Sequence, residues 1–399
     1  MLISELPEEC LLIIFGFINE LDDLMECYKV CSQWSRLILE RTRKVKYLFE
    51  HHEWWCYKVP PSYPFDYVYY SIPYEPMDVT FVSTLFPDLK IVEFSDDFWR
   101  RSNSEDIVTW VKKMKSLKGL MHIFFAKEEA IFQYCNELEM LSTDYVEACT
   151  NVNSVNIKQL CLVNDICGSF LENAHYFPNL ERLLLHTEED LRYYYDGPIF
   201  SRLKIVQFSK ADGSLWEEEL KGSTYYGFQF MDSCPNLQSA AISLEYNSIF
   251  VDESLQHKSL QDLVIVFSEP KDTDSVTWNE FKRLFIKYPN LKHLALRSWN
   301  RLTNNHVKQL VRILPNLVLF DVRDCPRVTQ KAVNYIQCYN RRHGRTIKFY
   351  FDGNYHNIQS DWPHLSTKYE KISQGFDFMK NCFLKDFYKL PTFLISSED

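Results

Sequence analysis

Charged and polar side chains recur at alternate positions of short apolar segments between residues 182 and 323. Arginine binds carboxylate and phosphate groups through paired hydrogen bonds, so the arginines of this series predict recognition of an acidic or phosphorylated protein segment. The pattern is equally compatible with simple solvation of exposed strand positions. The candidate substrate-binding residues are Arg182, His186, Gln207, His293, Arg297 and Arg323.

Catalytic and metal-binding patterns are missing from the sequence. It contains no GxSxG segment, no Walker-type phosphate loop and no HExxH segment. His51-His52-Glu53 is too isolated to predict a metal site, and the twelve cysteines include no CxxC pair. We expect a non-catalytic protein without cofactors, and we interpret its cysteines as buried, reduced thiols of a cytoplasmic or nuclear protein.

Composition restricts the classes of partner. The 399 residues are 46% hydrophobic and 25% charged, which is ordinary for a globular protein with a sizeable core. A net charge of −10 argues against nonspecific nucleic-acid binding, which requires clustered lysine and arginine. The N-terminal apolar run is short and acidic, unlike a signal peptide or a membrane anchor. We therefore expect neither nucleic acid nor membrane as a partner.

Three short helices are expected at the N-terminus. Pro7 suits the first turn of a helix, and Glu8 and Glu9 follow where the helix dipole favours negative charge. The next residues are apolar on nearly every side of this helix, which must then be buried on more than one side. A unit this small cannot cover so much apolar surface, so we expect a partner protein to do so. The apolar positions are Leu11, Leu12, Ile13, Ile14, Phe15, Phe17 and Ile18.

The same stretch resembles an F-box in the order and spacing of its residues. The family pattern is Leu-Pro, an acidic residue, an Ile/Leu-rich helix with a Phe near its end, an Asp-containing turn followed by Leu, then Val-Cys and Trp. Cys10 departs from it, because Ile or Val is more common there. The matching positions are Leu6-Pro7, Glu8, Leu11 to Ile14, Phe15, Asp22-Asp23-Leu24, Val30-Cys31 and Trp34.

This resemblance implies docking on a Skp-type adaptor, which bridges to a cullin and a RING subunit in a ubiquitin ligase of the SCF kind. Such a receptor needs no chemistry of its own, since it contributes proximity. Some of the implied residues, above all Trp34, are alternatively core of the helical unit. The residues implied to form the adaptor-docking surface, or to hold it in shape, are Leu6, Pro7, Leu11, Ile14, Phe15, Leu24, Val30 and Trp34.

Beyond residue 82 the chain repeats a short pattern. The segment FPDLKIVEFS (86–95) is echoed by FPNLERLLLH (177–186) and YPNLKHLALR (288–297), among others. An apolar anchor recurs at intervals of about 23 to 35 residues, the range of leucine-rich repeats with insertions. The expected anchors are Leu89, Leu117, Val152, Leu180, Leu203, Leu237, Leu260, Leu291 and Leu317.

These segments resemble the longer, helix-containing type of leucine-rich repeat. Alternating apolar residues would line one face of a short strand that cannot bury them alone, and stacked neighbours close the core. The resemblance implies an α/β solenoid with a curved parallel sheet inside and helices outside, and the turn at 324–329 implies that Cys325 packs in the core. An ordinary α/β domain with several short parallel strands is the alternative.

The domain order follows from these assignments. We expect an F-box at 1–46, an irregular aromatic- and proline-rich connector and N-terminal cap at 47–82, the repeat solenoid at 83–351, and a C-terminal cap or tail at 352–399. The basic run from Arg41 to Lys46 is interpreted as a solvated helix end. Long intervals at 117–152 and 203–237 predict inserted loops, and His122 predicts a slip of register near Leu117.

Taken together, the sequence predicts the substrate receptor of an SCF-type ubiquitin ligase, with an unidentified protein substrate on the concave face of the sheet. A scaffold or regulatory protein that uses the repeats without ubiquitin transfer is the alternative.

Overall fold

The computed structural model describes residues 3, 6–50, 67–71, 79–94, 104–122, 137–143, 146, 154–163, 169–186, 190–209, 224–245, 248–267, 276–361 and 392–393. They fall into two compact units. The boundary lies between Leu160 and Cys161, and Thr392 and Phe393 belong to the first unit.

The first unit opens with three helices, α1 (Glu8–Gly16), α2 (Leu21–Val30) and α3 (Ser32–Thr42). Pro7 occupies the N-cap of α1 with a φ of −54°, and Glu8 and Glu9 lie in its first turn, as predicted. Phe15 is 1% exposed and meets Trp34 edge-on with 5.0 Å between ring centroids. The three helices therefore share a small aromatic and aliphatic core.

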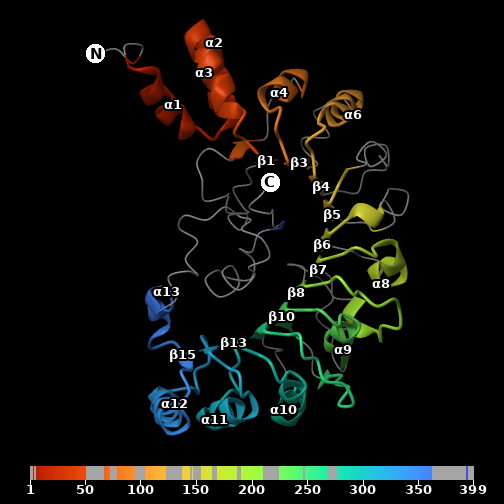
Figure 1. Cartoon of the computed structure of the whole chain (residues 1–399), viewed down its shortest axis with the longest axis vertical. Coiled ribbons are helices and arrows are strands. Elements are labelled where there is room, and N and C mark those ends of the chain that lie inside the picture. Colours follow the sequence, from red (N-terminus) through yellow and green to blue (C-terminus); the bar gives the residue numbers. More distant parts are fainter. Residues whose placement is uncertain are drawn as a thin grey trace. The chain divides into compact units, whose positions relative to one another are not determined.

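A parallel sheet follows in the same unit, with strand order β2-β1-β3-β4-β5-β6. Helices α4 and α6 cover one face of it (Figure 1). The strands are β1 (Tyr47–Glu50), β2 (Tyr67–Tyr70), β3 (Ile91–Phe94), β4 (Gly119–His122), β5 (Met140–Thr143) and β6 (Gln159–Val163), which begins in this unit. The helices are α4 (Val79–Leu85), α6 (Ser104–Lys113) and the 3₁₀ turn η3 (Ser154–Asn156).

The described parts of the expected connector differ from the prediction of an irregular segment. Strand β1 pairs with a parallel neighbour on each side, and β2 forms the edge of the sheet. An edge position suits a proline-rich sequence, because proline removes a donor from the hydrogen-bond ladder. Residues 51–66 and 72–78 lie outside the described residues.

The helices are joined to this sheet edge by main-chain hydrogen bonds. The amide of Tyr69 in β2 donates to the carbonyl of Asn19 at 2.8 Å, and Glu20 forms a parallel bridge with Tyr69. The turn between α1 and α2 thus covers donors and acceptors that an edge strand would otherwise leave unpaired.

Arg41 strengthens the same junction. Its guanidinium donates to the carbonyl of Phe15 at 3.3 Å, to Oδ1 of Asn19 at 2.9 Å and to the carbonyl of Tyr67 at 3.1 Å. Arg41 is only 1% exposed, so the interpretation of a solvated basic helix end is wrong for this residue, although Arg43 is exposed as expected. A planar fork of five donors can serve several acceptors on two elements at once.

Replacing Arg41 tests this junction. We expect Arg41→Ala to lower the free energy of unfolding by about 2–4 kcal/mol, because it removes a buried donor that bonds acceptors on α1, on the α1–α2 turn and on β2. Arg41→Lys should recover only part of this loss, since an ammonium lacks the fork. Urea denaturation of the full chain measures both, with Arg43→Ala as the matched control, and equal stability of R41A and R43A would contradict the role of Arg41.

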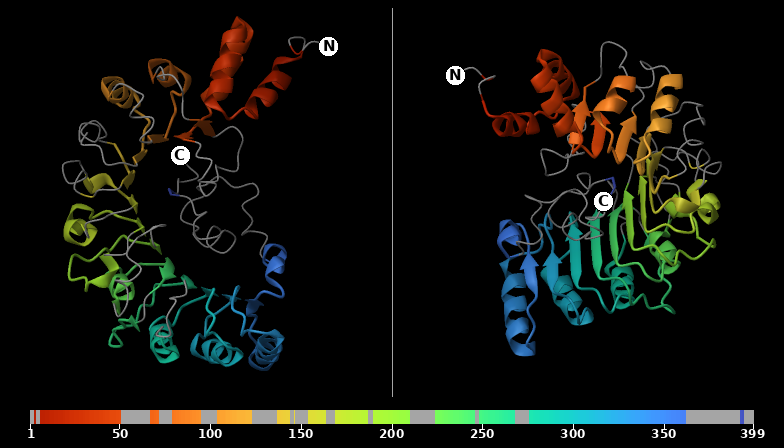
Figure 2. Two further views of the ribbon diagram at one scale, coloured as in Figure 1. Left: turned by 180° about the vertical axis from the view of Figure 1, so that it is seen from behind. Right: turned by 45° about the horizontal axis from the view of Figure 1, so that its top comes forward.

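The second unit is a run of parallel strands in the order β7-β8-β10-β12-β13-β14-β15, with the helices on the outer, convex side (Figures 1 and 2). We call the opposite sheet face the concave face. The strands are β7 (Arg182–His186), β8 (Ile205–Ser209), β10 (Ser239–Leu244), β12 (Asp262–Phe267), β13 (His293–Arg297), β14 (Leu319–Asp321) and β15 (Lys348–Tyr350). A separate two-stranded sheet pairs β9 (Thr224–Tyr225) with β11 (Ser248–Ile249).

Two of the outer helices begin with a capping box. Thr277 and Glu280 form a capping box, and Thr303 and His306 form a second one. Val307, Leu310 and Val311 are fully buried, as their helical spacing indicates. The helices are α8 (Ser169–Asn173), α9 (Gly227–Asp232), α10 (Trp278–Ile286), α11 (Asn304–Ile313), α12 (Gln330–His343) and α13 (Ile358–Asp361), with 3₁₀ turns η4 (Ala174–Tyr176), η5 (Asp190–Arg192) and η6 (Tyr355–Asn357).

Each expected anchor that the structure describes is buried, with at most 5% exposure, two residues before a strand. Val152 lies outside the described residues, but β6 begins two residues after Ile157, so the anchor of that repeat is Ile157. Two further anchors, Val45 and Leu138, precede β1 and β5 and were missed. The interval 117–152 therefore contains a strand rather than only a loop, and β4 pairs with both neighbours without a slip.

A buried charge pair links two outer helices of the second unit. Lys287 Nζ donates to Asp232 Oδ2 at 2.6 Å and to the carbonyl of Asp252 at 3.1 Å, and the two charged side chains are 2% and 9% exposed. His257 packs beside this pair, with Nε2 donating to the carbonyl of Cys234 at 2.9 Å. Burial lowers the pKa of His257 below its ordinary value of 6.5.

His257 makes stability depend on pH. Between its lowered folded-state pKa and 6.5 the unfolded chain binds a proton that the folded chain does not, so the free energy of unfolding should fall as pH falls through this window, by up to about 1.4 kcal/mol per pH unit. His257→Gln keeps a donor toward Cys234 and removes the titration. When the pH is lowered from about 7.5 to about 5.5, we expect the melting temperature of this variant to fall less than that of the parent chain. An equal fall in both proteins would contradict the role of His257.

Candidate functional site

Helix α1 has two apolar faces, and only one of them is covered. Leu11 and Phe15 are buried against the other two helices. On the opposite side, the exposed fraction is 56% for Ile13, 37% for Ile14 and 69% for Phe17. These three, with exposed Cys10, follow the i, i+3, i+4, i+7 spacing of one helix face. We call Cys10, Ile13, Ile14 and Phe17 the exposed stripe.

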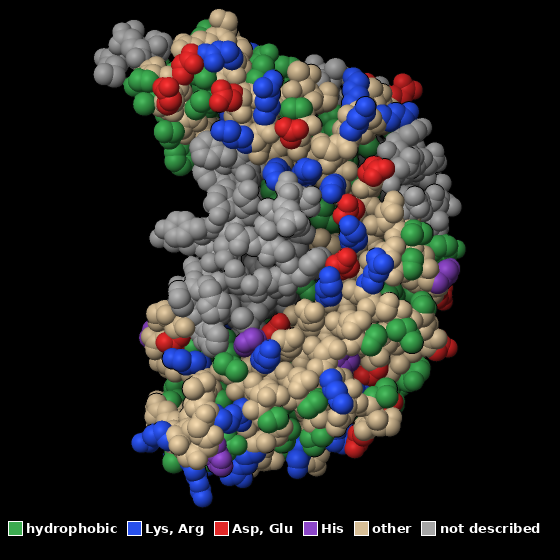
Figure 3. Space-filling view, viewed as in Figure 1, with side chains coloured by type: hydrophobic (Ala, Val, Ile, Leu, Met, Phe, Trp, Pro, Cys, Tyr) green, Lys and Arg blue, Asp and Glu red, His purple; other side chains and the backbone are tan. Residues whose placement is uncertain are grey.

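The predicted adaptor-docking residues divide by exposure. Pro7, Ile14 and Val30 are exposed, Val30 by 59%, and hydrophobic side chains are visible on the surface of these helices (Figure 3). Leu6 and Trp34 are half-buried. Leu11, Phe15 and Leu24 are buried in the helical core. The sequence analysis counted Ile13 and Phe17 among the apolar residues of this helix but did not name them as docking residues. Their position on the side of the helix opposite Leu11 and Phe15 was the signal that could have identified them.

The interpretation of all cysteines as buried is wrong in part. Cys161, Cys234 and Cys325 are buried, and Cys325 lies in the core as expected, where burial raises its pKa to about 12. Cys10 and Cys31 are exposed on the N-terminal helices, as is Cys338 on α12. The first two lie where apolar side chains also remain uncovered.

On the concave face of the second unit, predicted substrate residues form pairs between adjacent strands. Arg182 in β7 donates from Nε to Oε1 of Gln207 in β8 at 3.0 Å, and His186 contacts the hydroxyl of Ser209 on the same two strands. Arg182 and Gln207 are each 1% exposed. Parallel neighbours lie about 4.8 Å apart, so His186 reaches Ser209 at the matched position, and the longer Arg182 side chain reaches Gln207 diagonally, two positions along β8.

Four strands beyond β8, in β14, Asp321 contacts two of the predicted arginines. Arg297 donates from Nε at 3.1 Å and from Nη2 at 3.0 Å to Oδ2 of Asp321, and Arg323 donates from Nη2 to the same oxygen at 2.9 Å. Asp321 is fully buried, Arg297 is 6% exposed, and the Arg323 side chain is 17% exposed. One carboxylate thus accepts hydrogen bonds from two guanidinium groups.

His293 belongs to a third pair. Its Nδ1 lies 2.5 Å from Oδ1 of Asp262, and the other oxygen of Asp262 accepts from the hydroxyl of Ser239 at 2.6 Å. The structure thus brings the six candidates together as one set on β7 and β8 and another on β13 and the end of β14. Simple solvation does not describe Arg182, Gln207 or Arg297, because these side chains are buried and paired.

Within the described residues, no group of three or more histidine, cysteine or carboxylate side chains could hold a metal ion. Over the same ranges, none of the helices is both long and apolar enough to cross a membrane.

Asp321 can be tested by substitution. We expect Asp321→Ala to lower the free energy of unfolding by about 3–5 kcal/mol, because it removes the fully buried carboxylate that two guanidinium groups share. Arg323→Ala leaves the Arg297–Asp321 pair in place and should cost about 1 kcal/mol. Denaturation of the two variants under identical conditions compares them, and an equal cost would mean that Asp321 does not hold the cluster together.

Comparison with known proteins places the N-terminal helices in a family. Residues 3–43 match the family F-box-like. The comparison with curated proteins finds no match.

Three solved structures are similar to the chain at low identity. The TLR13–ssRNA13 complex has 13% identity and a TM-score of 0.43, and the match covers 67% of this chain but only 36% of that one. The Rad7 and Elc1 complex in yeast has 17% identity, a TM-score of 0.36 and coverage of 64% and 75%. The leucine-rich repeat-containing protein LegL7 from Legionella pneumophila has 12% identity, a TM-score of 0.32 and coverage of 65% and 74%.

The repeat assignment rests on the chain's own geometry. A buried apolar anchor lies two residues before each strand from β3 to β14 of the main sheet, and helices of the second unit cover the convex face of its sheet (Figure 1). Residues 3–43 match the F-box-like family, and the parallel strands and outer helices that follow have the architecture of a leucine-rich repeat solenoid.

Proposed function

We propose that the protein is the substrate receptor of an SCF-type ubiquitin ligase. Its F-box docks on a Skp-type adaptor, through which a cullin and a RING subunit are recruited. Its repeats hold a protein substrate, and it works in the cytoplasm or the nucleus. It is not itself an enzyme, because the ubiquitin-charged partner carries out the transfer and the receptor supplies proximity.

The exposed stripe of α1 is the observation that carries this proposal. Ile13 and Phe17 are more than half exposed, on a helix whose other face is already packed. Contiguous apolar side chains at a surface mark interaction sites, and the fully buried centre of an interface is richer in apolar groups than its rim. An amphipathic helix bundle of the adaptor would cover the stripe by helix-in-groove packing.

The eight adaptor-docking candidates take two roles in this proposal. Pro7, Ile14 and Val30 contact the adaptor together with Ile13 and Phe17. Leu6 and Trp34 form the half-buried margin. The buried residues Leu11, Phe15 and Leu24 hold the helices in the geometry that the adaptor recognises.

The six candidate residues on the concave face have two proposed roles in substrate binding, and the burial of each side chain decides which role it takes. His186, His293 and Arg323 are the less buried members and contact the substrate. Arg182, Gln207 and Arg297 hold them in position through the inter-strand pairs. Replacing Arg297 and Arg323 by Glu therefore tests substrate capture only if the variant still folds. Circular dichroism of the variant checks this.

Adaptor docking is testable with a triple substitution, Ile13→Ala, Ile14→Ala and Phe17→Ala. Alanine favours helix, so the fold should persist. Loss of three exposed apolar contacts should weaken adaptor binding by at least about 3 kcal/mol, roughly a hundredfold or more. Co-purification with a Skp-type adaptor and a cullin, followed by titration calorimetry, measures the change.

A matched control removes three exposed apolar side chains elsewhere. Ile199, Leu255 and Ile286 are 71%, 47% and 51% exposed on the second unit. Their triple substitution by Ala should leave adaptor binding unchanged. Capture of the adaptor without cullin would replace the ligase receptor by the scaffold alternative, and no adaptor binding by the parent chain would overturn the proposal.

A further inference from the structure

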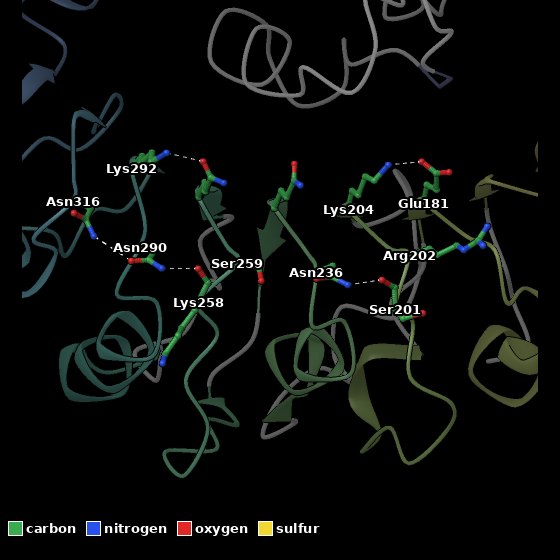
Figure 4. A pocket seen from close by; sticks show the side chains of 12 residues that line it. Glu181, Ser201, Arg202, Lys204, Asn236, Lys258, Ser259, Asn290, Lys292 and Asn316 are labelled. Atoms are coloured by element: carbon green, nitrogen blue, oxygen red, sulfur yellow. Dashed lines mark hydrogen bonds and ion pairs between the residues drawn. The ribbon is translucent and has the colours of Figure 1, made fainter.

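A groove of about 860 Å³ lies in the second unit where its strands begin (Figure 4). Its upper row consists of the residue immediately before each strand. Glu181, Lys204, Gln238, Gln261 and Lys292 hold this position before β7, β8, β10, β12 and β13. In Figure 4 Lys204 and Lys292 stand in this row near its two ends.

The backbone of the upper row is already occupied. The amide of Lys204 donates to the carbonyl of Glu181 at 2.8 Å, and that of Gln238 donates to the carbonyl of Lys204 at 2.8 Å. The same bond joins Lys292 to Gln261 at 2.8 Å. A ligand cannot add a strand here by main-chain pairing, so the groove must recognise it through side chains.

The lower row of the groove is braced by turn residues. Asn236 donates to the carbonyl of Ser201 at 2.7 Å, and Asn290 donates to that of Lys258 at 2.8 Å. Asn316 continues the series with a 3.0 Å bond to the carbonyl of Pro289. Each amide fixes the turn of the preceding repeat, so the row is a rigid polar floor rather than a set of mobile loops.

Positive charge dominates the groove. Its lining contains the cations Arg202, Lys204, Lys258 and Lys292 and the single carboxylate Glu181, a net charge of +3 in a chain of net charge −10. Glu181 pairs with Lys204 at 2.8 Å, and Lys292 donates to Gln261 at 3.0 Å. Across the described ranges, Arg202 and Lys258 have neither an ion-pair nor a hydrogen-bond partner, and both are exposed.

We propose that this groove binds an acidic protein segment in extended conformation. Lysine and arginine side chains are the partners that carboxylate or phosphate groups prefer, and the interleaved Gln238 and Gln261 amides donate to the same groups. The lining runs from the start of β7 to the turn before β14, six neighbouring strands about 4.8 Å apart and hence about 24 Å. An extended peptide of about seven residues covers that length at about 3.4 Å per residue.

Charge and size favour a protein segment over a nucleic acid. A long polyanion would meet repulsion from the remaining surface, since the whole chain is acidic with a pI near 5.6. Four cations suit a short segment with three or four acidic groups. Stacking platforms for bases are absent from the lining, which contains no aromatic side chain.

This inference does not depend on adaptor docking. The groove lies within the second unit, whereas the F-box belongs to the first, and the binding test below uses the full chain without an adaptor. It also places the binding of acidic groups at the starts of the strands, whereas the sequence analysis predicted it on the concave face. On the concave face Arg297 and Arg323 share Asp321, while at the strand starts the positive charge is largely uncompensated.

The test is fluorescence anisotropy with seven-residue labelled peptides at low ionic strength. An alternating Glu/Ser peptide and its phosphoserine counterpart should bind, with affinity that falls as salt is added. A Gln/Ser peptide should not. Tighter binding of the phosphorylated form would identify phosphate as the preferred source of charge, and tighter binding of the plain form would identify carboxylate; both support the groove.

The double variant Lys204→Gln and Lys292→Gln locates the site. Glutamine already holds this position in two neighbouring repeats, so the fold should tolerate it. We expect acidic-peptide affinity to fall about tenfold, whereas Glu181→Gln should raise it about threefold. Lys282→Gln with Lys331→Gln, two exposed lysines on α10 and α12, makes the same change of net charge and should alter affinity less than twofold.

The proposal fails if the neutral peptide binds as well as the acidic one, if neither acidic peptide binds at millimolar concentration, or if the control variant loses as much affinity as the groove variant. A single-stranded RNA heptamer that binds more tightly than either acidic peptide, and loses affinity in the groove variant, would overturn the choice of a protein segment.

Discussion

The residue immediately before most of the described strands sets the spacing on which the rest of the repeats depend. Its amide donates to the carbonyl of the equivalent residue one repeat earlier, as from Lys118 to Lys90 and from Lys292 to Gln261, both at 2.8 Å. The residue before it is the buried apolar anchor, for example Leu291, which is fully buried. A turn held by a main-chain bond on one side and a buried side chain on the other cannot slide, so matched positions of successive strands stay opposite one another.

This fixed register determines which charged side chains of neighbouring repeats lie close enough to form ion pairs. On the concave face side chains stand over the sheet, so a carboxylate such as Asp321 meets guanidinium groups from its own strand end and from the adjacent strand. At the strand starts the side chains project past the end of the sheet, where long lysines diverge into solvent. Glu181 balances only one of the four cations there, so the two rows of the same repeats have different electrostatic character.

Features set by neighbouring residues in the sequence could be predicted, whereas features that depend on contacts between distant segments could not. Anchors such as Leu180 and Leu317 follow a Pro-Asn turn, and Leu203 and Leu260 were recognised without one, whereas Leu138 was overlooked and the anchor of β6 was placed at Val152 instead of Ile157. The two apolar faces of α1 were predictable because helical spacing is a local property. The burial of Arg41 was not, because its acceptor on Tyr67 comes from a strand 26 residues away.

A stack of parallel strands leaves its first edge open, and the F-box closes it in this protein. The α1–α2 turn pairs with β2 through Asn19, and Arg41 spans the helices and Tyr67. The side of α1 that faces the other helices is buried within this cap, whereas the exposed stripe on its opposite side is open to another molecule. In the proposed receptor the adaptor would therefore rest on a helix that main-chain bonds tie to the first strand, so that the F-box and the sheet edge of the first unit act as one body.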